Sequence, residues 1–139
     1  MTTKDATEGA DRLVDNLLVV THRVHQVVAL VADRYDLTPQ QVELLRVLDE
    51  PMSMRAYADD LACDPSNVTG LVDRAELLGL VERVPDPLDR RVRMLNLTAK
   101  GRTIRSRVNN DLASELANAL GVTASDIGQI LHILGSMTP

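Results

Sequence analysis

The feature that most constrains this fold is a change in hydrophobic period after Gly79. Before Gly79, two apolar stripes with helical spacing are separated by a tight turn. After it, two short apolar runs alternate like strands on either side of a loop rich in proline and aspartate, and helical spacing returns after Thr98. This order predicts a helix-turn-helix followed directly by a β-hairpin, the wing of a winged helix-turn-helix.

Capping residues indicate where the other predicted elements begin and end. With six predicted helices and two short strands, the chain is expected to be mainly α-helical. A threonine, serine or aspartate precedes five of the six predicted helices, and a glycine ends two of them. We expect helices at about 10–34, from Thr38 to before Pro51, from Ser53, from Asp64 to Gly79, from Thr98 to Gly121 and from Thr123 or Ser125, with hairpin strands at 80–84 and 92–97.

The length and composition favour one ordered domain. The chain has 139 residues, of which 45% are hydrophobic, and this is enough for a core of its own. The N-terminal segment is polar and lacks the apolar stretch of a signal peptide, and no apolar run is long enough to span a membrane. Cys63 is the only cysteine, so a disulfide within the chain is excluded. We therefore expect a cytoplasmic protein.

The sequence contains no catalytic constellation. Phosphate-binding glycine loops, nucleophile elbows and histidine–glutamate metal motifs are missing. We therefore expect no enzymatic activity, no cofactor and no bound metal.

The charge is distributed unevenly along the chain. A net charge of −5 argues against a nucleic-acid partner when it is taken alone. Residues 65–107, however, carry nine basic side chains against five acidic ones, a balance of about +4. A basic segment inside an acidic chain can still steer that face toward phosphate.

The second helix of the predicted helix-turn-helix has one apolar face and one face of small polar side chains. Val68, Leu71 and Val72 share the apolar face. Such a helix fits the major groove of B-DNA with its N-terminal residues near base edges, although a helical hairpin in an ordinary bundle would have similar stripes. We expect DNA contacts from Ser66, Asn67, Thr69, Gly70 and Arg74, and a phosphate contact from Arg55 on the preceding helix.

Four segments of this region, Cys63–Arg74, Leu78–Arg83, Asp86–Arg91 and Leu95–Gly101, resemble the MarR family of bacterial transcription regulators. The resemblance implies a two-fold homodimer that binds a palindromic site on double-stranded DNA in a sequence-specific way. It implies one domain, 1–139, in which residues 38–98 form the DNA-binding lobe and residues 10–35 and 99–138 form a helical dimerisation region. A repressor released by a small-molecule ligand is the expected function, with an unknown ligand site.

Two arginines in the predicted wing are candidate DNA contacts. If the strand alternation continues to the loop, Arg91 lies on the same face as Leu95 and Leu97, toward the core. We predict that Arg91 forms a salt bridge with Asp73, a pairing that the family resemblance supports. Arg90 would then project from the tip into a narrow minor groove, whose negative potential attracts guanidinium groups.

Several features leave alternatives open. Gly70 stands where the family usually has a larger residue, so it either permits a close backbone approach to DNA or signals lost base contacts. Cys63 is expected to fill the turn between the two helices, with a redox switch as the alternative. His22, His25 and His132 could make the protein a metal-responsive regulator. A winged dimer that binds a protein instead of DNA is the main competing hypothesis.

Overall fold

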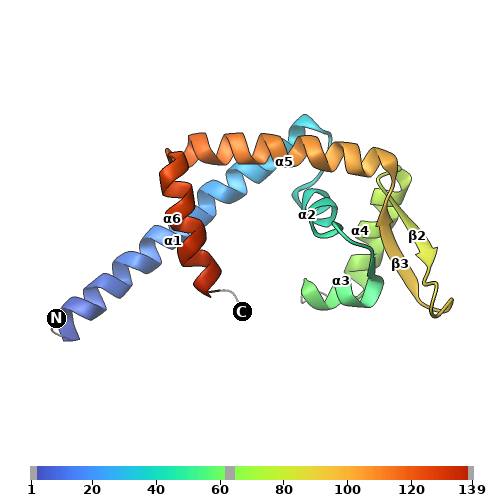
Figure 1. Ribbon diagram of the computed structural model, residues 1–139, viewed down its shortest axis with the longest axis horizontal. Helices are drawn as coiled ribbons and strands as arrows, with labels where there is room; N and C mark the ends of the chain where they lie inside the picture. The colour runs from blue at the N-terminus through green and yellow to red at the C-terminus, as the bar shows by residue number, and fades with distance from the viewer. Residues whose placement is uncertain (1–2, 62–64, 138–139) are drawn as a thin grey trace. The chain divides into compact units, whose positions relative to one another are not determined.

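The computed structural model describes residues 3–61 and 65–137. Its elements follow the order α1 (Thr3–Arg34), α2 (Pro39–Val47), β1 (Met52–Ser53), α3 (Met54–Asp60), α4 (Pro65–Leu77), β2 (Val81–Pro85), β3 (Arg93–Leu97), α5 (Ala99–Leu120) and α6 (Ala124–Met137) (Figure 1). The predicted six helices and the β-hairpin are confirmed. Helix α1 is longer than predicted, since it begins at Thr3 instead of near Ala10.

Side-chain caps begin several helices where the sequence places them. The Thr38 hydroxyl accepts a hydrogen bond from the Gln41 backbone N–H at 3.2 Å, and the Gln41 side chain accepts one from the Thr38 N–H at 2.9 Å. This reciprocal capping box satisfies two donors that the start of α2 would otherwise leave open. Ser53, Thr98 and Thr123 also cap helices with their hydroxyl groups, which accept from the N–H groups of Ala56, Gly101 and Asp126.

The three strands form one antiparallel sheet in the order β1-β3-β2. The hairpin register pairs Val81 with Leu97 and Arg83 with Leu95, while β1 pairs Met52 with Leu95. Strand β1 is not among the predicted elements, because a strand of two residues is too short to show an alternating pattern.

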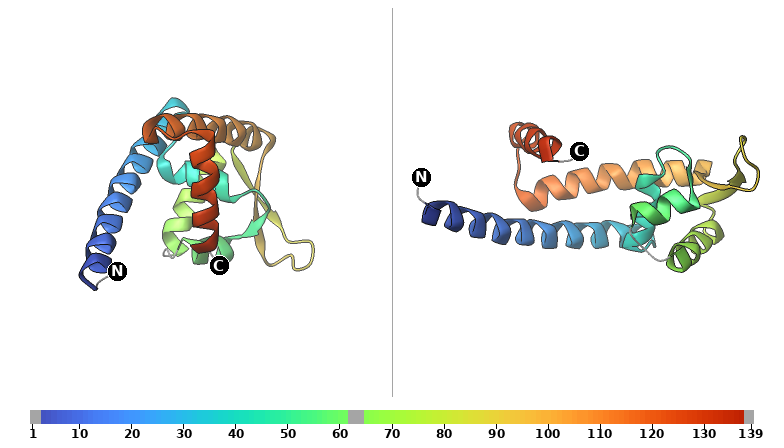
Figure 2. Two further views of the ribbon diagram at one scale, coloured as in Figure 1. Left: turned by 60° about the vertical axis from the view of Figure 1, so that its left-hand side comes forward. Right: turned by 90° about the horizontal axis from the view of Figure 1, so that it is seen from below.

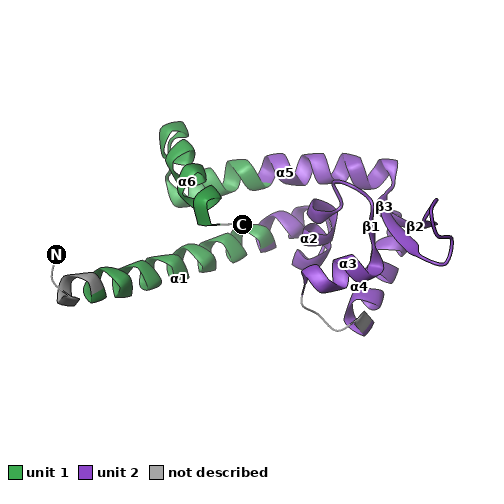
Figure 3. Ribbon diagram, turned by 60° about the horizontal axis from the view of Figure 1, so that its bottom comes forward, with its two compact units in different colours: residues 1–28, 112–139 green, residues 29–111 purple. Residues whose placement is uncertain are grey.

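The chain divides into two compact units, and both boundaries fall inside long helices (Figure 3). Unit 1 comprises residues 1–28 and 112–139, and unit 2 comprises residues 29–111. Unit 2 contains the helix-turn-helix and the sheet around one core. The largest fully buried side chains of that core include Tyr57, Leu44, Leu45, Val72 and Leu95.

Polar contacts attach the first part of α5 to the other helices of unit 2. The Tyr35 hydroxyl donates a hydrogen bond to Asp111 at 2.9 Å, and burial together with this bond raises the pKa of Tyr35. Arg105 forms an ion pair with Asp49 at 2.9 Å. These contacts link the segments that directly follow α1 and α2 to α5.

Unit 1 has a different character, because most of its large apolar side chains are exposed in the single chain. Arg23 of α1 donates a hydrogen bond to the Ala119 carbonyl of α5 at 3.3 Å. Helix α6 has no buried residue, although its sequence is strongly apolar. Across the described residues, no helix is both long enough and apolar enough to cross a bilayer.

Candidate nucleic-acid interface

Helix α4 has the two-faced character that the sequence predicts. Val68, Leu71, Val72 and Ala75 are buried in the core of unit 2. The opposite face exposes Ser66, Asn67, Thr69 and Arg74, while Gly70 is half-buried. Arg55 is exposed on α3, near its start. The turn that contains Cys63 and Asp64 lies outside the described residues, so the predictions for these two residues stay open.

Helix α4 ends at a glycine, as the sequence predicts. Gly79 has a φ of +70°, the left-handed conformation that glycine adopts most readily. Its N–H donates to the Glu76 carbonyl at 2.9 Å, and the Leu80 N–H donates to the Ala75 carbonyl at 3.0 Å, which is a Schellman arrangement. The Lys100 ammonium donates to the Leu78 carbonyl at 2.8 Å, so this charge stabilises the C-terminal end of α4.

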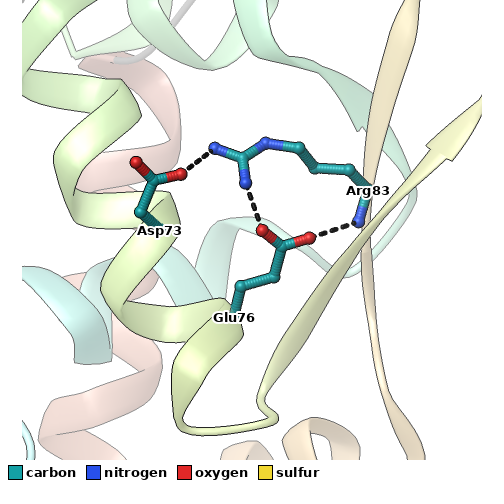
Figure 4. A network of polar contacts seen from close by, with 3 residues as sticks. All are labelled: Asp73, Glu76 and Arg83. Atoms are coloured by element: carbon teal, nitrogen blue, oxygen red, sulfur yellow. Dashed lines mark hydrogen bonds and ion pairs between the residues drawn. The ribbon is translucent and has the colours of Figure 1, made fainter.

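An ion network joins the end of α4 to the wing, which consists of β2, β3 and the loop between them. The Arg83 guanidinium contacts Glu76 with one nitrogen and Asp73 with the other (Figure 4). The Arg83 backbone N–H also donates to Glu76 at 3.2 Å. One residue of β2 is therefore held by two carboxylates that lie one turn apart on α4.

The predicted salt bridge between Asp73 and Arg91 is wrong in this structure. Asp73 pairs with Arg83, and Arg91 pairs with Asp89, two residues earlier in the chain, at 3.1 Å. The alternation used for the prediction stops at Arg93, where β3 begins, so Arg91 lies in a turn and its side chain is 92% exposed. The hydrogen bonds from Arg91 hold the pKa of the Asp89 carboxyl below its usual value.

The wing tip, residues 86–92, is ordered by its own hydrogen bonds. The Asp86 N–H donates to the Val92 carbonyl at 2.9 Å, and the Leu88 N–H donates to the Asp86 side chain at 2.8 Å. Arg90 is exposed in this tip and has no ion pair with any residue that the structure describes. The tip extends beyond the helices of unit 2 in both views of Figure 2. The arrangement thus presents Arg90 as a free cation on an ordered, protruding loop.

Gly70 is covered by a side chain of its own helix. A Cβ built at Gly70 would lie 3.5 Å from an Arg74 guanidinium nitrogen, which is ordinary van der Waals contact. The glycine therefore does not serve tight packing inside the protein.

Replacing Gly70 with alanine is expected to raise the free energy of unfolding by about 1 kcal/mol, because alanine has the higher helix propensity and finds space here. Urea denaturation measures this change, and an unchanged or lower midpoint would contradict it. If the variant is more stable but binds DNA more weakly, the bare backbone at Gly70 contributes to the interface.

The three histidines lie on exposed helix surfaces of the single chain. His22 and His25 are exposed on α1, and His132 is exposed on α6. Among the described residues, no three histidine, cysteine, aspartate or glutamate side chains come together as metal ligands.

Helices α3 and α4, followed by the β2–β3 hairpin, define a winged helix-turn-helix protein. Comparisons with known proteins place it more narrowly. Residues 37–92 match the profile of the MarR family. The chain is 28% identical over 109 residues to the HTH-type transcriptional regulator MgrA of Staphylococcus aureus, covering 77% of this chain and 74% of that protein. It is 34% identical over 102 residues to the transcriptional activatory protein BadR of Rhodopseudomonas palustris, covering 70% and 58%.

The fold agrees with these sequence matches. A mutant of MarR from E. coli, solved in complex with operator DNA, superimposes with a TM-score of 0.69 at 22% identity and full coverage of both chains. The chain therefore belongs to the MarR family.

Proposed function

We propose that this protein is a sequence-specific, double-stranded DNA-binding transcriptional regulator that acts as a homodimer. Each subunit inserts the exposed polar face of α4 into a major groove and Arg90 into the adjacent minor groove. The observation that carries the proposal is the pairing of these two surfaces in unit 2. A helix with a buried apolar face presents small polar side chains, and an ordered wing beside it presents an exposed arginine.

The known proteins that resemble this chain support the same function. MgrA and BadR are both named as transcriptional proteins, and the MarR structure contains operator DNA. The local excess of basic side chains in residues 65–107 favours association with a polyanion in spite of the acidic chain. Affinity should therefore fall steeply as the salt concentration rises.

The homodimer part of the proposal is supported by the exposed apolar side chains of unit 1. A single chain in water would leave many leucine, isoleucine, valine and methionine side chains unburied on α1 and on α6, which is unfavourable. The exposed members are Leu13, Val14, Leu17, Leu18, Val19, Val20, Ile127, Ile130, Leu131, Ile133, Leu134 and Met137. A second copy of the chain covers them and also supplies the second α4 and the second wing.

Selection of bound duplexes from a random DNA pool tests the proposal as a whole. A palindrome with half-sites about 10 bp apart is expected, because the two-fold symmetry of the protein is mirrored in its site. A folded, dimeric protein that enriches no sequence, and that binds no duplex at low salt, would contradict the proposal. It would favour the alternative in which the winged dimer binds another protein.

Replacing Arg90 with alanine is expected to weaken DNA binding roughly tenfold or more at unchanged thermal stability. The side chain is exposed and makes no ion pair within the described chain, so its loss removes DNA contacts and little else. Fluorescence anisotropy with a labelled duplex measures the Kd. Arg12→Ala is the matched control, because it removes the same charge from an exposed site on α1. Equal affinities of the two variants for DNA would show that Arg90 does not belong to the interface.

The direction of regulation is proposed to be repression, since occupancy of a promoter is enough to block transcription. BadR is named an activatory protein, so the family resemblance alone does not set this direction. A reporter gene behind the selected palindrome distinguishes the two modes, because expression falls with a repressor and rises with an activator. Release by a small-molecule effector stays a prediction from the family resemblance.

A further inference from the structure

The ion network at Arg83 attaches β2 to α4, while on the other side of the sheet β1 pairs with β3 as far as Met94. Val81, Arg83 and Pro85 point to one face of the sheet, since side chains alternate along a strand. Val81 at the inner end of this row is buried, Arg83 is partly buried and Pro85 is exposed. On this face of β2 the apolar packing therefore ends at Val81, and the next residue of the row, Arg83, contacts α4 through the ion network.

On the neighbouring strand β3, burial also decreases from the inner end toward the wing tip. Leu97 and Leu95 are buried opposite Val81 and Arg83, and Arg93 is exposed opposite Pro85. Leu95 holds the middle of β3 in the core, while Arg83 at the same level of β2 pairs with Leu95 and directs its side chain to the carboxylates of α4.

The geometry of these contacts restrains the rotation of the wing relative to α4 as well as its separation from α4. A guanidinium is a planar fork, so contacts from its two ends to two different carboxylates fix its orientation, whereas one ion pair would leave a pivot. The third contact, from the Arg83 N–H to Glu76, attaches the strand backbone to the same carboxylate. The network also offsets the negative charge of Asp73, which lies beside Arg74 on the exposed face of α4.

We infer that Arg83 is a positioning residue for DNA binding, because it sets the direction of the wing relative to α4 and so places Arg90 in the minor groove. This inference rests on the proposed function. Arg83 acts through Arg90 and does not itself contact DNA.

The first test measures the direction of the wing without DNA. Leu77 at the end of α4 and Leu88 in the wing tip are 88% and 97% exposed, so each can be changed to cysteine and spin-labelled in a Cys63→Ser background. Mixing with excess unlabelled chain restricts the measurement to distances within one chain. Arg83→Gln is expected to broaden the distribution of label-to-label distances. An unchanged distribution overturns the inference whatever the DNA affinities are.

The second test is a double-mutant cycle on DNA affinity. Arg83→Gln is expected to weaken binding of the selected duplex about tenfold in the parent, and less than twofold when Arg90 is already alanine. Equal losses in the two backgrounds overturn the inference, because Arg83 would then act through its own charge. Arg93→Gln is the matched control. It removes the same charge from the wing, but Arg93 has no ion pair among the described residues, so it should leave the label distances unchanged.

The tests also distinguish a variant that does not fold from a protein that does not bind DNA. If Arg83→Gln fails to fold, Glu76→Gln removes one side of the network, and the same broadening and the same non-additivity are expected. A parent protein that binds no duplex at low salt defeats the proposed function and this inference with it. A parent that binds, with an Arg83→Gln variant that binds equally well, defeats only the inference.

Discussion

Replacing Gly101 with alanine is expected to destabilise unit 2 by more than about 3 kcal/mol, although the glycine lies in the first turn of a helix. A Cβ at this position would lie 1.9 Å from the Leu80 carbonyl oxygen and 2.9 Å from its carbon. The Leu80 carbonyl cannot withdraw easily, because it accepts hydrogen bonds from the Thr98 N–H at 3.1 Å and from the Thr98 hydroxyl at 3.2 Å. The start of α5 and the start of β2 would have to separate.

Gly70→Ala is the matched control for Gly101→Ala, since it makes the same change in another helix of unit 2. The two variants are expected to change the urea midpoint in opposite directions, because the added methyl finds space at Gly70 and a backbone carbonyl at Gly101. A Gly101→Ala variant as stable as the parent would show that β2 and α5 can shift apart at little cost. It would then contradict the tight contact described here.

Replacing Leu131 and Leu134 together with glutamate is expected to convert the protein to monomers. Both side chains are at least half exposed on α6 in the single chain, and they lie three residues apart on one side of the helix. An interface that covers them would have to bury two unpaired carboxylates, which costs several kcal/mol. Sedimentation equilibrium measures the mass, and far-UV circular dichroism shows whether the helices persist.

DNA binding should fall with the loss of the dimer. Linking two half-site contacts typically raises affinity by about 100-fold or more over one contact, so the monomeric variant should lose that factor on a palindrome. Gln129→Glu with Ser136→Glu is the matched control, because it adds the same two charges to polar, exposed positions of α6. A Leu131→Glu, Leu134→Glu protein that remains dimeric would place the dimer interface elsewhere.

Most of the secondary structure could be predicted from local signals. The hydroxyls of Thr38, Ser53 and Thr98 lie at helix starts, and each bonds a backbone N–H within three residues. Gly79 and Gly121 both adopt the left-handed conformation after a helix. These interactions depend on neighbours in the chain, so residue types and spacing are enough to indicate them. The two-residue strand β1 was missed, because it exists only through its pairing with β3.

The candidate interface was predicted less completely. The exposed face of α4 followed from the apolar spacing of its other face, and the position of Arg90 followed from the loop. The partners of the charged side chains did not. Asp73 has several arginines within reach in the sequence, and the choice of Arg83 over Arg91 depends on where β3 begins and on which residue of β2 faces α4.

The sequence by itself determined the order of the elements, their caps and the division of α4 into an apolar and a polar face, because these follow from interactions between residues a few positions apart. Only the tertiary structure decided that Arg83 pairs with Asp73 and Glu76, that Lys100 stabilises the end of α4 and that Gly101 admits no side chain. Each of these depends on atoms that different elements of the fold bring together. Their distances are set by the packing of unit 2, which no local pattern encodes.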